Sequence, residues 1–327
     1  MRSIKLPSWT ERLLGIDARP VPPHVFTVDV GTLVYGRFVR SESGYEVEDF
    51  AQIDLPQDLF AEGPLGGPMH DPGLFRPLLE ELVKSVDVPL DEASLVLPDA
   101  WLRLAFADME ELPSRGARRD ELLRWKLKRL VPFRVEDLRL EGVPAITLPE
   151  QEAKHRLLIG FAIDVLLRQF EQVFEACGVR IGQILNTSLA TVESIRSVVD
   201  GAGLGVLALV GSTGYSLTFM QHGEPLLHRF RALDTAMGGE AAAQLVLRDL
   251  KLTRSFLEEQ LPGLELARIL LVSQTGQQRF WLDSLEQGLG QVPVALGREQ
   301  LPLRGELPEV APTVLAPMLG AACREVA

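Results

Sequence analysis

The chain has 327 residues, of which 46% are hydrophobic and 24% charged, and these ordinary globular values exclude a disordered or fibrous protein. Its 33 basic and 45 acidic residues leave a formal net charge of −12, which argues against broad nucleic-acid binding because such binding needs a basic surface. The length favours two domains or lobes over a single core.

No segment approaches the roughly 18 uncharged apolar residues of a membrane helix, and no signal-peptide core follows the first residues. We therefore expect a cytoplasmic protein. Residues 1–24 are predicted to form a surface segment in which apolar residues such as Ile4 and Trp9 alternate with basic ones. This segment is either a helix packed on the body or a short helix lying on a membrane surface.

A strand–turn–strand–strand unit is predicted near the start of the chain. Val25–Val30 is an apolar strand that runs into the turn Asp29-Val30-Gly31-Thr32. Two further strands follow, at Leu33–Val39 and Tyr45–Ile53, joined by a turn that ends at Gly44.

The middle of the chain alternates helices and strands. Two of the predicted helices end at residues that interrupt a helix. The basic helix at 118–131 stops at Pro132, and the helix at 165–177 is capped by Gly178 in the left-handed conformation. The predicted helices and strands are a helix at 74–86, a strand at 93–97, a helix at 118–131, a strand at 155–163, a helix at 165–177, a strand at 179–185 and a helix at 188–199.

The strand unit of the N-terminal region recurs near residue 205. The apolar strand Gly205–Val210 leads into Gly211-Ser212-Thr213-Gly214, and a half-buried strand follows in which Ser216 and Thr218 alternate with apolar residues. A turn at 221–224 and a strand at 226–230 complete it. This internal repeat predicts two homologous lobes that face one cleft. The remaining pattern predicts a helix at 239–259, a strand at 269–272 and helices at 280–289 and 310–325, which makes the fold class α/β.

The two turns of the repeat have the composition of phosphate-binding loops. Glycine permits close backbone approach, hydroxyls can bond phosphate oxygens, and an Asp can hold a magnesium-bound water. A simple β-turn with a capping Asp is the alternative for the first turn. The candidate nucleotide-binding residues are Asp29, Gly31, Thr32, Gly211, Ser212 and Thr213.

Here the sequence resembles the actin-like ATPase superfamily and, within it, the PilM proteins of bacterial type IV pilus machines. The resemblance rests on the two loops, on Leu97-Pro98-Asp99-Ala100, and on Leu123 through Val131-Pro132-Phe133 with Glu136. It implies an actin-like, duplicated ribonuclease-H-like fold with an inserted α/β subdomain. The boundaries it implies are a first lobe at 25–92 and 187–202, an inserted subdomain at 93–186 and a second lobe at 203–327.

The departures from the family pattern concern nucleotide chemistry. The family's phosphate-binding lysine falls on Gly36, and the acidic residue of the second loop falls on Leu209. The adenosine loop corresponds to the stretch that contains Gly276. A site with one acid and no lysine has little to clamp a metal or activate water, so we expect a pseudo-ATPase without a cofactor or catalytic residues. A slow ATPase that binds ATP and magnesium is the alternative.

A basic segment, Arg118–Arg134, stands out on this acidic chain. It is either a solvated helix face or a docking site for an acidic tail or an anionic membrane surface. Aromatic residues beside a basic rim suit a peptide groove. The candidate partner-binding residues are Arg124, Trp125, Lys128, Arg129 and Phe133.

The resemblance implies a scaffold at the cytoplasmic side of the inner membrane, in a type IV pilus or a type II secretion-like assembly. PilM-type proteins hold the cytoplasmic tail of the single-span membrane protein PilN in a groove beside the inserted subdomain and contact the pilus motor ATPases. A homodimer is compatible with this role. The related GspL cytoplasmic domain continues into a membrane helix, and the division protein FtsA carries a C-terminal membrane-targeting helix. Neither follows at the end of this sequence, which favours the free-standing PilM arrangement.

Overall fold

The structure is a computed structural model that describes residues 21–42, 44–63, 65–110, 117–131, 134–148, 155–199, 203–233, 239–273, 278–305, 308 and 310–323. The predicted N-terminal segment therefore lies outside the described residues, apart from residues 21–24. Phe133 and Gly276 also lie outside them.

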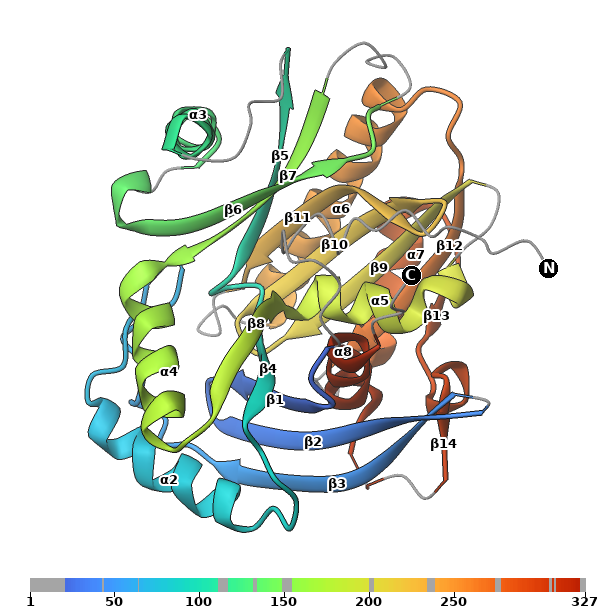
Figure 1. The fold of residues 1–327 in the computed structure, drawn as a ribbon. Helices are drawn as coiled ribbons and strands as arrows, with labels where there is room; N and C mark the ends of the chain where they lie inside the picture. Colours follow the sequence, from blue (N-terminus) through green and yellow to red (C-terminus); the bar gives the residue numbers. More distant parts are fainter. Residues whose placement is uncertain are drawn as a thin grey trace, which may run out of the picture.

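The first lobe is built on a six-stranded sheet in the order β14-β3-β2-β1-β4-β8 (Figure 1). Strands β1, β2 and β3 form the predicted antiparallel unit. Strands β4 and β8 continue the sheet in parallel with β1. The strands are β1 (His24–Asp29), β2 (Thr32–Ser41), β3 (Gly44–Asp54), β4 (Glu92–Leu97), β8 (Arg180–Asn186) and β14 (Leu303–Arg304).

The second lobe repeats this topology. Its sheet has the order β11-β10-β9-β12-β13, with two antiparallel pairs followed by two parallel pairs, which matches β3-β2-β1-β4-β8 strand for strand. The strands are β9 (Leu204–Gly211), β10 (Gly214–Gln221), β11 (Glu224–Ala232), β12 (Leu266–Ser273) and β13 (Pro293–Ala295). The predicted duplication and the α/β class are confirmed.

Two left-handed turns follow the sequence signals. Gly178, after the helix α4 (Asp164–Ala176), has φ +82°, as its helix-capping position requires. The β10–β11 hairpin turns through His222 (φ +52°) and Gly223 (φ +70°), a pair of positive φ values that suits the twist of a two-residue hairpin.

A third, three-stranded sheet forms the inserted subdomain, in the order β5-β7-β6. Its strands are β5 (Arg103–Met109), β6 (Leu138–Ala145) and β7 (His155–Ile163), and the helix α3 (Ala117–Leu127) packs on it. Leu123 and Leu127 of α3 are buried against this sheet. Of the three strands, only β7 was predicted, because β5 and β6 are partly exposed along most of their length and lack a continuous apolar run.

The boundaries of the inserted subdomain need correction. The prediction of 93–186 includes β4 and β8, yet both strands hydrogen-bond into the first sheet, and only residues from β5 to β7 form the separate sheet. Parallel strands need crossover connections, so a strand distant in sequence can join a sheet without any local signal.

Helices cover both faces of the first sheet. On one face lie α2 (Pro72–Lys84) and α4, whose Phe75, Phe170 and Phe174 pack around Phe26 of β1. On the other face lie α5 (Thr187–Val199) and α8 (Pro312–Ala322). The second sheet carries α6 (Gly239–Gln260) and α7 (Gln278–Leu289), with buried side chains of both helices in one core. Short 3₁₀ helices occur at Val135–Asp137 and Arg298–Gln300.

The C-terminal helix α8 returns to the first lobe, which corrects its predicted place in the second. It packs on α5 and on β1 and β4, and β14 just before it pairs with β3. A Cβ atom added at Gly320 would lie 1.6 Å from the carbonyl oxygen of Ala190, so the two helix backbones almost touch. Small residues at this crossing are what allow α8 to reach the first lobe.

The strand β10 is buried on both faces, whereas its alternating pattern predicted one exposed face. Ser216 and Thr218 are both 0% exposed. α5 packs on β10 on the side where solvent was expected.

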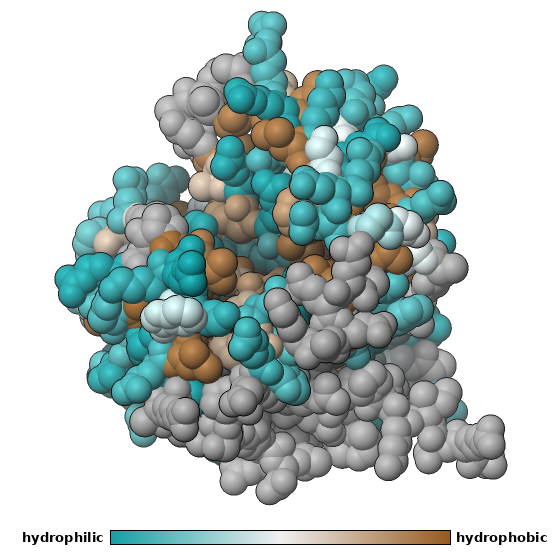
Figure 2. All heavy atoms as spheres, turned by 90° about the horizontal axis from the view of Figure 1, so that it is seen from above, coloured by the Kyte–Doolittle hydropathy of each residue, from teal (hydrophilic) through white to brown (hydrophobic). Residues whose placement is uncertain are grey.

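Within the described part of the chain, no helix is both long and apolar enough to cross a membrane. On the face shown in Figure 2, most described side chains are hydrophilic, with hydrophobic ones in patches among them.

Candidate functional site

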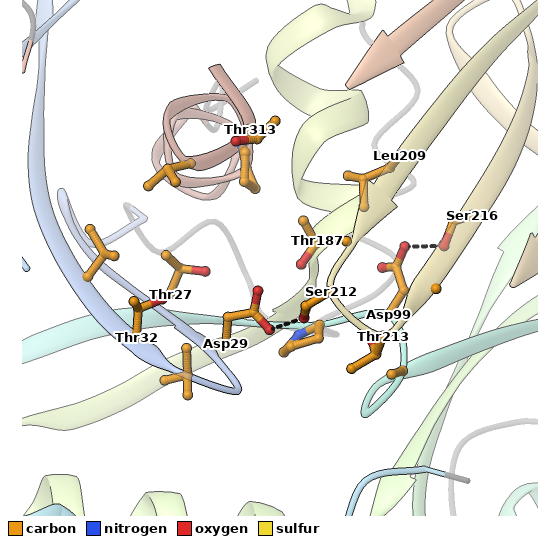
Figure 3. Close-up of a pocket in the computed structure, with 18 of the residues that line it drawn as sticks. Thr27, Asp29, Thr32, Asp99, Thr187, Leu209, Ser212, Thr213, Ser216 and Thr313 are labelled. Carbon is orange, nitrogen blue, oxygen red and sulfur yellow. Dashed lines mark hydrogen bonds between the residues drawn. The ribbon is translucent and has the colours of Figure 1, made fainter. Parts of the chain in front are cut away.

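The two repeated turns meet in a cleft between the lobes (Figure 3). Its volume is about 270 Å³, and it lies under the crossing of α5 and α8. The first lobe contributes the ends of β1 and β2 and the segment after β4, and the second lobe contributes the β9–β10 hairpin. The polar lining residues are Thr27, Asp29, Thr32, Gln52, Asp99, Thr187, Ser212, Thr213, Ser216 and Thr313.

A side-chain hydrogen bond joins the two turns directly. Ser212 Oγ donates to Asp29 Oδ1 at 3.1 Å, and the same oxygen accepts from the backbone N–H of Val30 at 2.7 Å. Asp29 and Thr32 form the last register pair of the β1–β2 hairpin, and Gly211 and Gly214 do so in β9–β10. The structure thus brings together Asp29, Gly31, Thr32, Gly211, Ser212 and Thr213, as the repeat predicted.

Nothing in the described structure requires a glycine at position 31. A Cβ atom added there would meet nothing within 4 Å, and its φ is not in the left-handed region. Gly214 differs, because a Cβ atom there would lie 2.2 Å from the carbonyl oxygen of Arg231.

The described lining of this cleft combines carboxylates and hydroxyls with apolar side chains. Among the described residues that line it there is no Lys or Arg to pair with a phosphate, and its two acidic side chains are Asp29 and Asp99. Leu209, at the position of the family's second acidic residue, is 6% exposed and lines the cleft with its aliphatic side chain.

A buried carboxylate, that of Asp99, also lines the cleft and is 4% exposed. It accepts a hydrogen bond from the backbone N–H of Ser188 at 2.9 Å, and others from the hydroxyls of Ser188 and Ser216, the latter at 2.5 Å. Ser188 belongs to α5 and Ser216 to β10. This single carboxylate therefore ties the end of β4 to the first turn of α5 and to the second lobe.

Two titratable side chains, those of Arg103 and His228, lie near Asp99. Burial lowers the pKa of the Arg103 guanidinium to about 10, an effect that the charge of Asp99 partly opposes, and Arg103 stacks over the Phe230 ring at 4.3 Å. Burial also lowers the pKa of His228, whose Nδ1 lies 2.9 Å from the hydroxyl of Thr218. Asp99 was not predicted as a residue of the cleft, because its only local signal is an acid two positions after a buried strand.

A second hollow, of about 580 Å³, lies between the inserted sheet and the start of α4. Leu138 and Leu140 of β6 line it together with Ile163 and Val165, and charges of both signs surround them. The charged lining residues are Asp120, Arg124, Glu136, Asp137, Arg139, Asp164 and Arg168. We call this hollow the charged groove.

Arg139 closes one wall of the charged groove. Its Nε donates to Asp164 at 2.7 Å, and its two terminal nitrogens donate to Glu171 at 2.5 and 3.1 Å. Arg168 donates to the other oxygen of Asp164 at 2.7 Å. Burial by itself would raise the pKa of Asp164, but its bonds to the two arginines outweigh burial and lower it.

The predicted partner-binding residues separate in space. Arg124 lines the charged groove and donates to the carbonyl of Val135. Trp125 is 52% exposed and does not line it, with Lys126 Nζ and Arg129 Cζ each 5.5 Å from its ring centre. Lys128 Nζ is 3.8 Å from Glu136. The groove residues on β6 and α4 were missed because no local pattern marks them.

No family model and no curated protein matches this sequence. Solved structures do match. One is a chain of the PilM–PilN type IV pilus biogenesis complex, with a TM-score of 0.72 and 15% identity, covering 93% of this chain and 97% of that one. Another is a Bacteroides thetaiotaomicron protein with an actin-like ATPase fold and unknown function, with a TM-score of 0.51, 11% identity, and coverage of 89% and 94%.

The duplicated sheets, the cleft between them and these matches define a protein with an actin-like fold. Its similarity to a chain of the PilM–PilN complex extends over 93% of the residues. The resemblance to PilM-type proteins that the sequence predicted is confirmed in the fold.

Proposed function

We propose that this chain is a protein-binding scaffold of a type IV pilus-like assembly at the inner membrane, and that it holds the cytoplasmic tail of a PilN-like membrane protein. The observation that carries the proposal is the charged groove beside the inserted sheet, in a fold similar to that of the PilM–PilN complex. Contacts with pilus motor ATPases would use surfaces outside this groove.

The groove has the chemistry of a peptide site. Val165 is 54% exposed at its wall, and Leu140 and Ile163 are partly exposed beside it, so apolar side chains of a bound segment would gain burial. β6 is an edge strand of the described sheet, and an edge strand can accept an extended peptide through its backbone. Charges of both signs at the rim favour a tail with its own mixed charges.

A binding assay tests this proposal. The probe is a synthetic peptide of the cytoplasmic tail of a single-span membrane protein encoded beside the gene for this chain, titrated by calorimetry. Val165→Asp and Arg168→Glu change two exposed groove residues, 54% and 67% exposed, and each should weaken binding about tenfold. Leu74→Asp and Lys84→Glu on α2 are matched controls at 52% and 78% exposure and should leave it unchanged. Equal binding by groove and control variants would refute the proposal.

The same proposal includes a pseudo-ATPase. It is supported by the described cleft lining, which has no cation, and by the Asp29–Ser212 hydrogen bond between the two turns. Calorimetry with ATP and magnesium should show no binding at micromolar concentrations. If micromolar binding is found and Asp29→Ala abolishes it, the nucleotide-switched alternative replaces the pseudo-ATPase, while the groove proposal is tested separately by the peptide.

A further inference from the structure

On the outer face of α6, apolar and charged side chains are exposed, and no residue within the described ranges packs over them. Leu252 and Phe256 lie four residues apart on one stripe of the helix and are 57% and 41% exposed. The opposite face of the helix buries Val246, Leu250 and Leu257 in the core of the second lobe. The exposed pair is therefore not needed for the packing of α6 itself.

A shallow, open depression on the same face is lined by side chains of α6 alone, with Leu252 of the exposed pair among them. Its lining residues are Gln244, Leu247, Arg248, Lys251, Leu252 and Ser255. The projecting ring of Phe256 lies just C-terminal to the depression. One surface thus carries both a protruding aromatic side chain and a depression that could receive one.

The charged side chains on this face are separated by sign along the helix. Arg248 and Lys251 lie on the N-terminal side of the exposed pair, and Glu259 lies on the C-terminal side. None of the three forms an ion pair with another residue that the structure describes. Glu258, by contrast, is already paired with Arg254 at 2.9 Å. A face with cations at one end and an anion at the other is complementary to its own copy when that copy runs antiparallel.

We propose that the outer face of α6 is a homodimer interface in which two copies of the helix pair antiparallel about a two-fold axis. Phe256 of each copy packs into the shallow depression of the other, and the two-fold axis crosses the outer face of α6 at the height of residues 253 and 254. Arg248 then faces Glu259 of the second copy, and the symmetry repeats this pair. The interface goes beyond the proposed tail binding, because the charged groove lies on α3, β6 and α4.

The interface is a weak one. A single helix face falls short of the about 800 Å² per partner of a standard complex, so a dissociation constant on the order of tens of micromolar is expected. The dimer would form where the protein is locally concentrated, as it is in a multiprotein assembly.

Sedimentation equilibrium of the full chain, from about 1 to 200 μM, measures the dimer directly. Arg248→Glu and Glu259→Arg should each raise the dissociation constant about 10- to 30-fold, because each change turns two attractive ion pairs into repulsive ones. The double variant Arg248→Glu with Glu259→Arg restores opposite charges and should return to within about threefold of the wild type. Phe256→Glu should abolish the dimer in the same range.

Matched variants on α2 control for general charge and polarity effects. Leu74→Glu and Lys84→Glu, at 52% and 78% exposure, should leave the dissociation constant unchanged. Circular dichroism checks that each variant is folded. A wild-type chain that stays monomeric throughout the range overturns the proposal. A dimer that ignores Phe256→Glu, or a double variant as weak as the single ones, shows a different interface and also overturns it.

Discussion

Gly320 allows the close crossing of α5 and α8, and a single methyl group there should measurably destabilise the protein. The added Cβ atom of Gly320→Ala would lie 1.6 Å from the Ala190 carbonyl oxygen and 3.1 Å from the backbone nitrogen of Ser194. Ordinary contact begins at 3.4 Å, so the two helices must separate by about 1.8 Å. The contacting atoms belong to backbone, which cannot rotate away as a side chain could.

The separation should outweigh the gain in helix propensity. Overpacking a filled core costs about 1–3 kcal/mol and more where the backbone must move, whereas Ala in place of a helical Gly gains about 1 kcal/mol. We expect a net loss of up to about 2 kcal/mol in the free energy of unfolding. The perturbation also reaches the cleft, because Thr187 of α5 and Thr313 of α8 both line it.

Urea unfolding followed by tryptophan fluorescence and circular dichroism measures this loss. Trp101 and Trp281 are each 3% exposed and lie in the cores of the first and second lobes, so both lobes contribute to the signal. Gly31→Ala is the matched control: its Cβ atom meets nothing within 4 Å, and a change within about 0.5 kcal/mol is expected. A Gly320→Ala protein that is as stable as the wild type, or more so, would refute the close crossing of the two helices.

Three further changes probe the polar network and the inserted sheet. Asp99→Ala leaves the buried donors of Ser188 and Ser216 without an acceptor and should cost about 3 kcal/mol or more in urea unfolding, with little change for the exposed-loop control Asp58→Ala. Burial lowers the pKa of His228 in the folded state, so the free energy of unfolding should fall as the pH drops below about 6.5, by up to about 1.4 kcal/mol per pH unit. His228→Gln should reduce this pH dependence, measured as urea midpoints across the same pH range. Arg139→Ala removes three hydrogen bonds from β6 to the carboxylates of Asp164 and Glu171 on α4. It should cost about 1 kcal/mol, seen as faster limited proteolysis between the inserted sheet and the first lobe.

The strand units and most helices could be predicted because their signals are local. The buried strand β9, the capping Gly178 and the turn at His222–Gly223 depend on periodicity and on backbone conformation within a few residues. The internal repeat also allowed the two-lobed architecture to be predicted, because two copies of one strand unit indicate two similar lobes. The partly exposed strands β5 and β6 carry weaker local signals and were missed.

Tertiary structure decided which faces of the predicted elements are buried. The alternation in β10 predicted solvent on one side, yet Ser216 is fully buried because α5 and the Asp99 carboxylate come to it from the first lobe. Likewise, α8 follows the second lobe in sequence but packs on the first, since Gly320 lets it touch α5.

Local sequence patterns were sufficient to predict two glycine turns that face each other across a cleft. These turns are Asp29-Val30-Gly31-Thr32 and Gly211-Ser212-Thr213-Gly214. Their composition, spacing and repetition are properties of neighbouring residues. Only the tertiary structure placed Ser212 on Asp29, added Asp99 to the cleft, and joined β6 to α4 in the charged groove. Those contacts link residues tens to hundreds of positions apart, and their geometry follows from the packing of three sheets, which no local pattern encodes.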